Sequence, residues 1–491
     1  MAIDAVVRES KLEVTRLPVR MAADARRVIA RLFVPGGASR IREIIGRVAS
    51  LGDGEVSSML ATLVTDYRLR HKDIRGIFRQ NFVLATANVG IDVQLSDERR
   101  LLLGAYFTSE YSIESVALFN PSMVLHPDQN GVPRGSVRFI VSVRACGEGH
   151  ISSIEFRSGL IDAEHRITFD PTSRFALTGR PEDDMLYDKS SYVLKLVEMK
   201  AHRPWADAVL GLLDNEFSIA DLKYAIDKCR PQGTDTSFKE LADNMLWLAH
   251  SNYHLEFSPD VQLSERVIFP VSENESRGIE DARFVRFTSP VGSVVYYATY
   301  TAYNGFRVLP QLIETTDFRY FKINTLNGRC VQNKGMALFP RKFGDDFVMA
   351  SRLDGENIYL LRSPNIHFWN ESKLIHGPKH SWEFVQVGNC GSPIETPQGW
   401  VLLTHGVGPM RQYWLGALLL DLEDPSKVIG ELREPLLAPN ADERDGYVPN
   451  VVYSCGAMLH DDRLIIPYAI SDSYSSVATV SMSDLLSHLM H

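Results

Sequence analysis

The sequence predicts a mainly β protein with added helices, and three observations indicate this fold class. Short β-rich runs such as VRFIVSVRA, SVVYYATYTAY and GWVLLTHGV recur from about Asn120 to the end of the chain. Turn residues separate many of them, as at residues 344–346, 397–399 and 460–462, so neighbouring runs should pair as antiparallel hairpins. Few helices come between the runs, which is typical of a sandwich, a barrel or a propeller.

Helical periodicity dominates the first part of the chain. Apolar residues recur at helical spacing in MAADARRVIARLFV, residues 21–34, and in GEVSSMLATLVTDYRLRH, residues 54–71. Ser96 can cap a further helix in SDERRLLLGAYF, because two acidic residues follow it in the first turn. We therefore expect an N-terminal helical region over residues 1–115 and a β domain over residues 116–491.

Three more segments have a helical period although they stand between β runs: WADAVLGLLDNEF, IADLKYAIDKC and FKELADNMLWLAHSNYH. They predict a helical insertion at about residues 203–253. The N-terminal region is locally basic, which is more typical of a solvated helix face or a subunit contact than of a nucleic-acid site. We expect its helices to join copies of the chain in a homo-oligomer or to cover one face of the β domain.

Composition excludes several classes of protein. With 491 residues, 45% hydrophobic and 23% charged, the chain resembles an ordinary soluble globular protein. No apolar run approaches the ~20 residues of a membrane span, and the N-terminus lacks the apolar segment of a secretory signal. A net charge of −9 argues against nucleic acid. We expect a cytoplasmic protein without nucleic-acid or membrane partners.

Familiar site motifs are also missing. The five cysteines are spread widely and show neither a Cys-x-x-Cys pair nor the Cys/His spacing of a zinc site, so we expect reduced thiols and no metal. There is no Walker A motif, no Gly-x-Gly-x-x-Gly after a strand and no Gly-x-Ser-x-Gly. The candidates that are left are polar residues at strand ends, where a β scaffold places its active site.

The stretch SRGIEDARFVRF, residues 276–287, puts five charged residues into a segment that otherwise resembles a strand. A buried strand face rarely tolerates unpaired carboxylates. Two interpretations are about equally good: an arginine–carboxylate pair that holds a turn, or a catalytic carboxyl with its neighbours.

Five motifs together resemble glycoside hydrolase family 130. In order along the chain they are GIEDARF at 278–284, GMALFPRKFGDDFVMASR at 335–352, GNCGSPIETPQGWVLLTHGV at 388–407, LGALLLDLEDPSKVIG at 415–430 and VPNVVYSCG at 448–456. The resemblance covers roughly residues 120–485. It implies a five-bladed β-propeller with the active site in the central channel. It also implies an inverting phosphorylase that acts on β-mannosides, since most members have this activity and some are β-mannosidases.

On this resemblance Asp281 is the general acid. It is expected to protonate the glycosidic oxygen through a hydroxyl of the mannose while phosphate attacks the anomeric carbon from the opposite face. Lys334, Arg352 and His405 match the family's phosphate-binding positions, and charged donors of this kind suit phosphate oxygens. Inorganic phosphate is thus the expected co-substrate, with no other cofactor. The expected partner is a manno-oligosaccharide or a mannosyl-disaccharide.

Other positions are candidates for sugar binding. Asn120 and Asp472 match residues that contact mannose hydroxyls in the family. Tyr303 and Trp382 could stack on a sugar, although both residue types are more often core aromatics. The remaining candidates are arginines with structural alternatives: Arg144 and Arg157, which could contact an anion or sugar or instead pair with Glu148 or Glu155, and Arg283, which could bind substrate or orient Glu280 or Asp281.

The chain departs from the family pattern at three places. Ala282 replaces a common proline, Lys334 and Gly335 stand where arginine and asparagine are usual, and Glu395 replaces a frequent lysine. Lysine lacks the two parallel N–H donors of an arginine side chain, and an added carboxylate repels phosphate, so both changes weaken phosphate binding. We therefore predict a phosphorylase that releases α-mannose 1-phosphate, with two alternatives. One is an inverting β-mannosidase with Glu395 or Glu383 as its base, and the other is a non-catalytic glycan-binding propeller.

Overall fold

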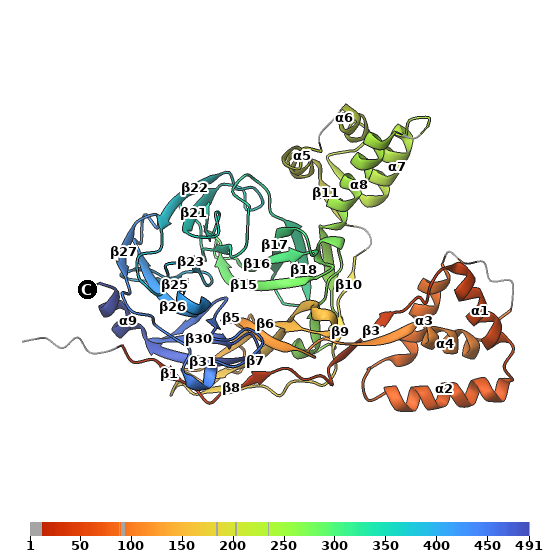
Figure 1. The fold of residues 1–491 in the computed structure, drawn as a ribbon, viewed down its shortest axis with the longest axis horizontal. Coiled ribbons are helices and arrows are strands. Elements are labelled where there is room, and N and C mark those ends of the chain that lie inside the picture. The colour runs from red at the N-terminus through yellow and green to blue at the C-terminus, as the bar shows by residue number, and fades with distance from the viewer. Residues whose placement is uncertain are drawn as a thin grey trace, which may run out of the picture.

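The computed structural model describes residues 12–490 except 88, 90–93, 183–184, 202–203 and 234. Residues 1–11, part of the predicted N-terminal region, lie outside the described residues. The predicted β runs all form strands, and these strands follow one another around the left-hand part of the molecule (Figure 1). The prediction of a mainly β protein is therefore confirmed.

The strands from β5 onward form five successive antiparallel groups within the described residues. The first group contains β5 (Ala117–Leu125), β6 (Val137–Cys146), β7 (Ser152–Ile161) and β8 (Ile167–Phe169), and the second contains β15 (Gly278–Thr288), β16 (Val294–Tyr303), β17 (Val308–Thr315) and β18 (Tyr320–Thr325). The third group contains β19 (Ala337–Leu338), β20 (Phe347–Ser351), β21 (Ile358–Ser363) and β22 (Glu371–His376), and the fourth contains β23 (Gln386–Asn389), β24 (Ile394–Thr396), β25 (Gly399–Val407), β26 (Tyr413–Leu420) and β27 (Val428–Glu431). The fifth group contains β28 (Val452–Tyr453), β29 (Met458–His460), β30 (Arg463–Ile470) and β31 (Tyr474–Ser481). Pairings among the described strands do not close these groups into one continuous sheet.

Short strands and one helix connect or edge these groups. They are β9 (Leu177–Thr178), β10 (Arg180–Pro181), β13 (Tyr253–Glu256), β14 (Arg266–Ile268) and the C-terminal helix α9 (Met482–Leu489). β14 pairs with β7, and β15 also touches β7 through Gly278 and Ser152, so the first two groups share one sheet. Gly278 has φ +126° and its missing Cβ would lie 2.7 Å from the Ser152 nitrogen, so glycine is required at this contact.

The start of the described chain completes the last strand group. β1 (Thr15–Arg16) and β2 (Met21–Ala22) both pair antiparallel with β31. Arg16 also forms a 2.9 Å ion pair with Glu443, a residue near the other end of the chain. Residues from both ends of the sequence therefore form a single sheet.

The N-terminal region is only partly helical. Its helices are α1 (Ala38–Ala49), α2 (Asp53–Tyr67), α3 (Ile74–Thr86) and α4 (Asp97–Tyr106), and Ser96 caps α4 by accepting a 3.3 Å hydrogen bond from the Arg99 nitrogen. The helix predicted over residues 21–34 is wrong, because this segment forms β2 and β3 (Val28–Leu32). β3 pairs with β4 (Thr108–Ser112) and buries Val28 and Ile29, and this long-range pairing outweighs the local period.

The helical insertion begins earlier than predicted. It contains α5 (Lys189–Glu198), α6 (Pro204–Leu210), α7 (Ile219–Cys229) and α8 (Thr236–His250), with the short pair β11 (Leu186–Asp188) and β12 (Glu216–Ser218) at its base. The prediction of about residues 203–253 missed α5, which begins where the Asp188 carboxylate caps it by accepting from the Ser191 nitrogen at 2.8 Å. The four helices share a core of their own, so the insertion packs as one unit.

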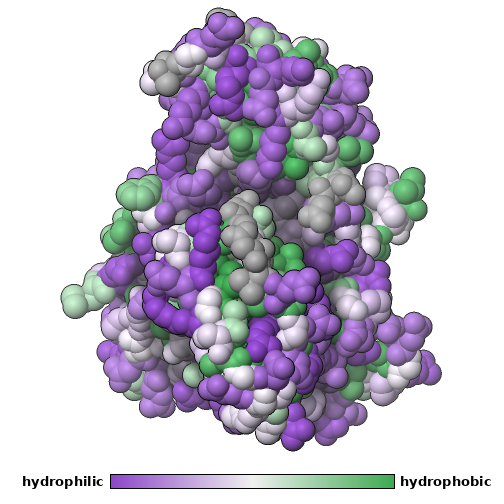
Figure 2. Space-filling model, turned by 90° about the vertical axis from the view of Figure 1, so that its right-hand side faces the viewer, coloured by the Kyte–Doolittle hydropathy of each residue, from purple (hydrophilic) through white to green (hydrophobic). Residues whose placement is uncertain are grey.

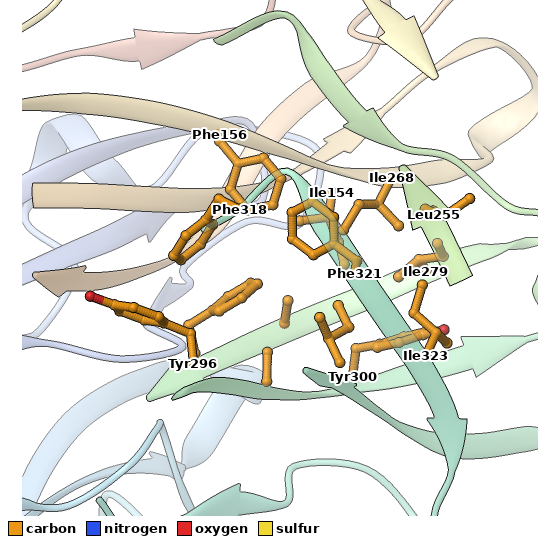
Figure 3. Packing of buried hydrophobic residues seen from close by; sticks show 14 of the residues in the cluster. Ile154, Phe156, Leu255, Ile268, Ile279, Tyr296, Tyr300, Phe318, Phe321 and Ile323 are labelled. Carbon is orange, nitrogen blue, oxygen red and sulfur yellow. The ribbon is translucent and has the colours of Figure 1, made fainter. Parts of the chain in front are cut away.

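The first two strand groups pack face to face around a large aromatic core. Figure 3 shows Phe156 of β7 and Phe321 of β18 close together, above Tyr296 and Tyr300 of β16. Phe156 and Phe321 stack with their ring centroids 5.8 Å apart. This core fixes β15, the strand of the second group that carries the GIEDARF motif, against the first group.

The N-terminal helices stand beside the strand groups rather than over them (Figure 1). Seen from their side, the surface is indented between the helical insertion and the N-terminal helices, with hydrophobic patches among hydrophilic residues (Figure 2). Exposed large apolar residues of this region are Phe33, Val34, Val83, Leu84 and Tyr106. The described N-terminal helices therefore do not cover a face of the strand groups, which was one of the two expectations for them. The other expectation, a contact between subunits, stays a prediction. Among the described residues, every helix is too short or too polar to cross a membrane.

We expect a chain that starts at Ala23 to unfold at a lower temperature than the full chain. The truncation removes β1 and β2 and leaves the edge of β31 unpaired, and it removes the Arg16–Glu443 ion pair and the buried Met21 side chain. Thermal melting followed by circular dichroism measures the effect. A chain starting at Leu12 is the control, because it keeps both strands, and equal melting temperatures for the two truncations would contradict the expectation.

Candidate functional site

Topology brings the predicted site residues to one end of the strand groups. In every group, the strand that pairs with the group's first strand ends at or near such a residue, and because these strands have the same place across their sheets, their ends lie on the same side. The strands and residues are β6 with Arg144, β16 with Tyr303, β20 with Arg352, β25 with His405 and β30 with Asp472. Strand position thus assembles a site that no single motif contains.

Asn120 and Asp281 lie on the neighbouring strands β5 and β15, each at an irregularity of the strand. The pairing register shifts between Phe119 and Ser122 and between Glu280 and Arg283. Both residues have positive φ, 49° for Asn120 and 56° for Asp281, a backbone conformation that is uncommon outside glycine. The Asn120 amide donates a 2.7 Å hydrogen bond to Asp281 Oδ1. Two such backbone distortions that present two polar side chains to each other indicate a functional position.

Charged groups surround this pair. Arg144 donates to Asp281 Oδ1 at 3.4 Å and to Glu280 Oε1 at 3.0 Å. Lys334 contacts the other oxygen of Glu280, and its ammonium lies 5.7 Å from the centre of the Tyr303 ring. Glu280 therefore forms ion pairs with two cations, as the structural interpretation of GIEDARF expected, and the catalytic role of Asp281 beside them stays a prediction.

The pKa of Asp281 is the result of opposing effects. Burial favours the neutral carboxyl, but the positive charges of Arg144 and Arg283 and the hydrogen bond from Asn120 outweigh it, so the pKa of Asp281 lies below its ordinary value. In the ligand-free site Asp281 is thus an anion at neutral pH. Any role as an acid requires it to take up a proton after substrates bind.

Asp472 behaves in the opposite way. Burial, together with the negative charge of Asp281, raises the pKa of Asp472 to about 6, although Arg144 and Arg411 act against the shift. Its φ of +50° is a third positive value among the predicted site residues. Two carboxyl groups with pKa values moved apart are typical of acid and base pairs in enzymes.

Arg283 was predicted to bind substrate or to orient Glu280 or Asp281, and its hydrogen bonds correct this. The side chain is buried, and Nη1 donates to the carbonyl oxygens of Asn389 and Cys390, each at 3.0 Å. Nη2 donates to the Tyr453 hydroxyl at 2.7 Å. Because these partners occupy the guanidinium, Arg283 joins β15 to the fourth and fifth strand groups, and it acts on Asp281 only through its charge.

The three predicted phosphate ligands form two clusters. Arg352 Nη1 lies 3.0 Å from His405 Nε2, whereas Lys334 pairs with Glu280 beside Asp281. Burial and the charges of Arg352 and Arg283 lower the pKa of His405 well below its ordinary value, so the imidazole is neutral and accepts from Arg352. His405 therefore orients Arg352 through this nitrogen rather than donating to an anion. Glycine at 388 permits this arrangement, since a Cβ there would lie 2.5 Å from both side chains.

Several other candidates lie apart from these clusters. Arg157 pairs with Glu114 at 2.7 Å and with Glu155 at 3.3 Å in a buried network, which confirms the structural alternative. Trp382 is a buried aromatic that donates to the Arg433 carbonyl at 3.0 Å.

The two glutamates proposed as a hydrolytic base have other partners. Glu395 pairs with Arg341 at 2.8 Å in a partly exposed position of β24. Glu383 is buried and accepts from the backbone nitrogens of Lys379 and His380. Neither carboxylate makes a described hydrogen bond or ion pair with Asp281 or with the cations beside it.

Some of the unsatisfied polar atoms belong to the candidate site, while others are spread over the rest of the molecule. Within the described residues, buried side-chain atoms without a hydrogen-bond partner include Asn120 Oδ1, Arg144 Nε, Arg352 Nε and Asn389 Oδ1. Such atoms are rare in native proteins, and a ligand rich in hydroxyl groups or phosphate oxygens would satisfy them. Sequence reasoning missed Asn389 and Tyr453, although GNCG and VPNVVYSCG contain them, because their contacts join different strand groups.

Comparison with known proteins identifies the family. The model of glycoside hydrolase family 130, described as beta-1,4-mannooligosaccharide phosphorylase, matches residues 260–491. The 1,2-beta-oligomannan phosphorylase of Thermoanaerobacter sp. is 35% identical over 236 residues, which cover 46% of this chain and 75% of that protein. The beta-1,4-mannooligosaccharide phosphorylase of Ruminococcus albus is 26% identical over 277 residues, which cover 54% of this chain and 78% of that protein.

Solved structures also resemble the chain in part. The solved structure of the Listeria innocua beta-1,2-mannobiose phosphorylase in complex with beta-1,2-mannobiose covers 76% of this chain and 92% of that chain, with a TM-score of 0.45 and 21% identity. On the sequence similarity, the chain belongs to glycoside hydrolase family 130, as its five motifs predicted.

We expect Asp472→Asn to stabilise the fold at pH 8 but not at pH 4. The folded pKa of about 6 is above the ordinary 3.8, so folding takes up a proton between these values and stability falls as the pH rises through this window. The ionised carboxylate then costs up to ~3 kcal/mol above pH 6, which the neutral amide avoids. Melting temperatures across this pH range measure the difference. Asp345→Asn, which removes an exposed charge, is the control, and equal pH profiles for the two variants would contradict the expectation.

Proposed function

We propose that the chain is an inverting β-mannoside phosphorylase that cleaves a manno-oligosaccharide or mannosyl-disaccharide with inorganic phosphate and releases α-mannose 1-phosphate. The observation that carries the proposal is the hydrogen-bonded pair of Asn120 and Asp281, held at two strand irregularities and surrounded by cations. Family membership supports it, since the relatives that match are named as mannoside phosphorylases. We further propose that the five strand groups are the blades of a five-bladed β-propeller, with this pair in its central channel.

In this proposal Asp281 is the general acid. It is anionic in the free site because Arg144 and Arg283 lower its pKa. A phosphate bound nearby would offset these positive charges, and the pKa of Asp281 would rise toward the range in which it holds a proton. The proton then passes to the glycosidic oxygen, with a hydroxyl of the mannose between them. Asn120 stays hydrogen-bonded to the carboxylate and keeps its oxygen pointed at the same position.

We assign phosphate binding to Arg352, because its guanidinium has an N–H donor without a partner among the described residues. Arg352 uses Nη1 on the neutral His405, and its Nε has no partner among the described residues. A guanidinium with free N–H groups can hold two phosphate oxygens at once. Lys334 adds positive charge on the side of Asp281, where Glu280 restrains it. Because phosphate is already an anion, its attack needs no protein base.

The second candidate is an inverting β-mannosidase, and Asp472 is the observation that favours it. A carboxyl group with a pKa of about 6 is half ionised at that pH and is a suitable general base near neutrality. A water molecule between Asp472 and the anomeric carbon would then replace phosphate as nucleophile. The proposal of a phosphorylase and this alternative differ in one measurable property, which is the requirement for phosphate.

We expect cleavage of β-mannosides to depend on inorganic phosphate, with α-mannose 1-phosphate as product. Arg352→Ala should raise the KM for phosphate roughly 10- to 100-fold and leave the KM for the sugar nearly unchanged, since a hydrogen bond to a charged group contributes about 1.5–3 kcal/mol. Initial rates at varied phosphate, with products separated by chromatography, measure both. Arg341→Ala is the control, because Arg341 pairs with a partly exposed glutamate away from Asp281. Equal rates without phosphate, with free mannose as product, would instead establish the hydrolase.

We expect Asp281→Asn to lower kcat about 10²- to 10⁴-fold, because acid catalysis supplies an acceleration of this order. The amide keeps the shape of the side chain, so the circular dichroism spectrum should match that of the parent. Steady-state rates at saturating phosphate and mannoside give kcat. A variant that folds normally and retains most of its turnover would remove Asp281 from the chemical step.

A further inference from the structure

Two hairpin turns that are distant in sequence meet on the outside of the first and last strand groups. The turn between β7 and β8 carries His165, and the turn between β29 and β30 carries Asp461, preceded by His460 at the end of β29. One ligand atom from each of these three residues lies within 4.8 Å of the other two. The imidazole rings of His165 and His460 are 5.6 Å apart between their centres.

The donor atoms are partly free to bind a ligand. His165 Nδ1 is buried from solvent and has no hydrogen-bond partner among the described residues. His460 Nε2 donates a hydrogen bond to the Gly135 carbonyl oxygen at 3.1 Å and lies 3.8 Å from Asp461 Oδ2, and an ion bound through this nitrogen would replace that hydrogen bond. A third chain segment, the loop before β6, therefore brings a backbone oxygen to the same place. Two imidazoles, a carboxylate and a carbonyl make a mixed nitrogen and oxygen donor set.

Both turns are held in place independently of any ligand. The Asp162 carboxylate accepts from the backbone nitrogens of Glu164 and Arg166, at 3.0 and 2.9 Å, and so fixes the loop that carries His165. The Asp462 carboxylate accepts from the Ser481 hydroxyl at 2.8 Å and from the Ser483 nitrogen at 2.9 Å, and so fixes the other turn. His165 and Asp461 both have positive φ, 61° and 49°. Ligands on restrained turns lose little conformational freedom when a metal binds.

The geometry points to a binding site for a divalent transition-metal ion such as Zn²⁺, formed by His165, His460 and Asp461. Imidazole nitrogen with carboxylate oxygen suits Zn²⁺ better than Mg²⁺ or Ca²⁺, which prefer oxygen donors alone. Around a tetrahedral Zn²⁺ with bonds of about 2.0–2.1 Å the donor atoms are about 3.3 Å apart. Small rotations of the side chains close the present separations to that value. The ion would link the first strand group to the last one, and sequence spacing could not indicate it because the two histidines belong to different groups.

Equilibrium dialysis of the full chain against ZnCl₂, followed by elemental analysis, tests the site. We expect one equivalent of zinc per chain, a rise of the melting temperature with zinc and its reversal by EDTA, since a ligand of the folded state stabilises it by mass action. His165→Ala and His460→Ala should each weaken zinc binding at least ~10-fold, and Asp461→Asn should weaken it less. An excess of CaCl₂ or MgCl₂ should not displace the zinc.

His150→Ala is the matched control, because His150 is an exposed histidine on another turn. It should bind zinc like the parent. If the double variant with alanine at 165 and 460 folds, as judged by circular dichroism, and still binds one equivalent with the parent's affinity, the assignment is wrong. It is equally wrong if the parent shows no saturable binding, or if calcium displaces the zinc. Should one histidine variant fail to fold, the other and Asp461→Asn carry the comparison.

Discussion

The guanidinium group of Arg283 connects three strand groups whose positions together define the site. It lies on β15 and donates to two carbonyl oxygens at the end of β23 and to the Tyr453 hydroxyl on β28. A buried charge costs several kcal/mol unless hydrogen bonds satisfy it. Removal of Arg283 would therefore leave the two carbonyl oxygens and the Tyr453 hydroxyl without their donor. The same charge lowers the pKa of Asp281 two residues away. One buried side chain thus holds three strand groups together and, with Arg144 and Asn120, keeps the Asp281 carboxyl group ionised.

The site also follows from how antiparallel strands alternate in direction. Strands with the same place in successive groups end on the same side, so residues from β6, β16, β20, β25 and β30 come together without any local sequence relation. In a regular strand, side chains point alternately to the two faces of the sheet. An irregularity can turn a side chain toward the strand end, and Asn120 and Asp281 lie at two such irregularities.

Much of this could be predicted from the sequence, and the errors have physical reasons. The β runs were identifiable because each is a short apolar segment bounded by turn residues, and Ser96 was identifiable because a cap is a local signal. The segment 21–34 has a helical period but forms strands, since pairing with β31 and β4 gains more than a local helix. The role of Arg283 was misjudged and Asn389 was missed because their partners lie on other strand groups. The resemblance to the family assigned Lys334 and Arg352 to one phosphate site. In the structure Lys334 pairs with Glu280 and Arg352 contacts His405, so the two cations belong to separate clusters.

The pairing of β1 and β2 with β31 has a consequence for the order of assembly during synthesis. A ribosome makes β1 and β2 long before β31, so these strands cannot reach their final hydrogen bonds until residues 474–481 have emerged. Contacts between segments so far apart in the sequence form slowly, because a long loop must close before they gain any free energy. β30, which ends just before Asp472, also pairs with β31. Until β31 has emerged, β1 and β2 are unpaired strands in the nascent chain, open to any cellular factor that shields such strands.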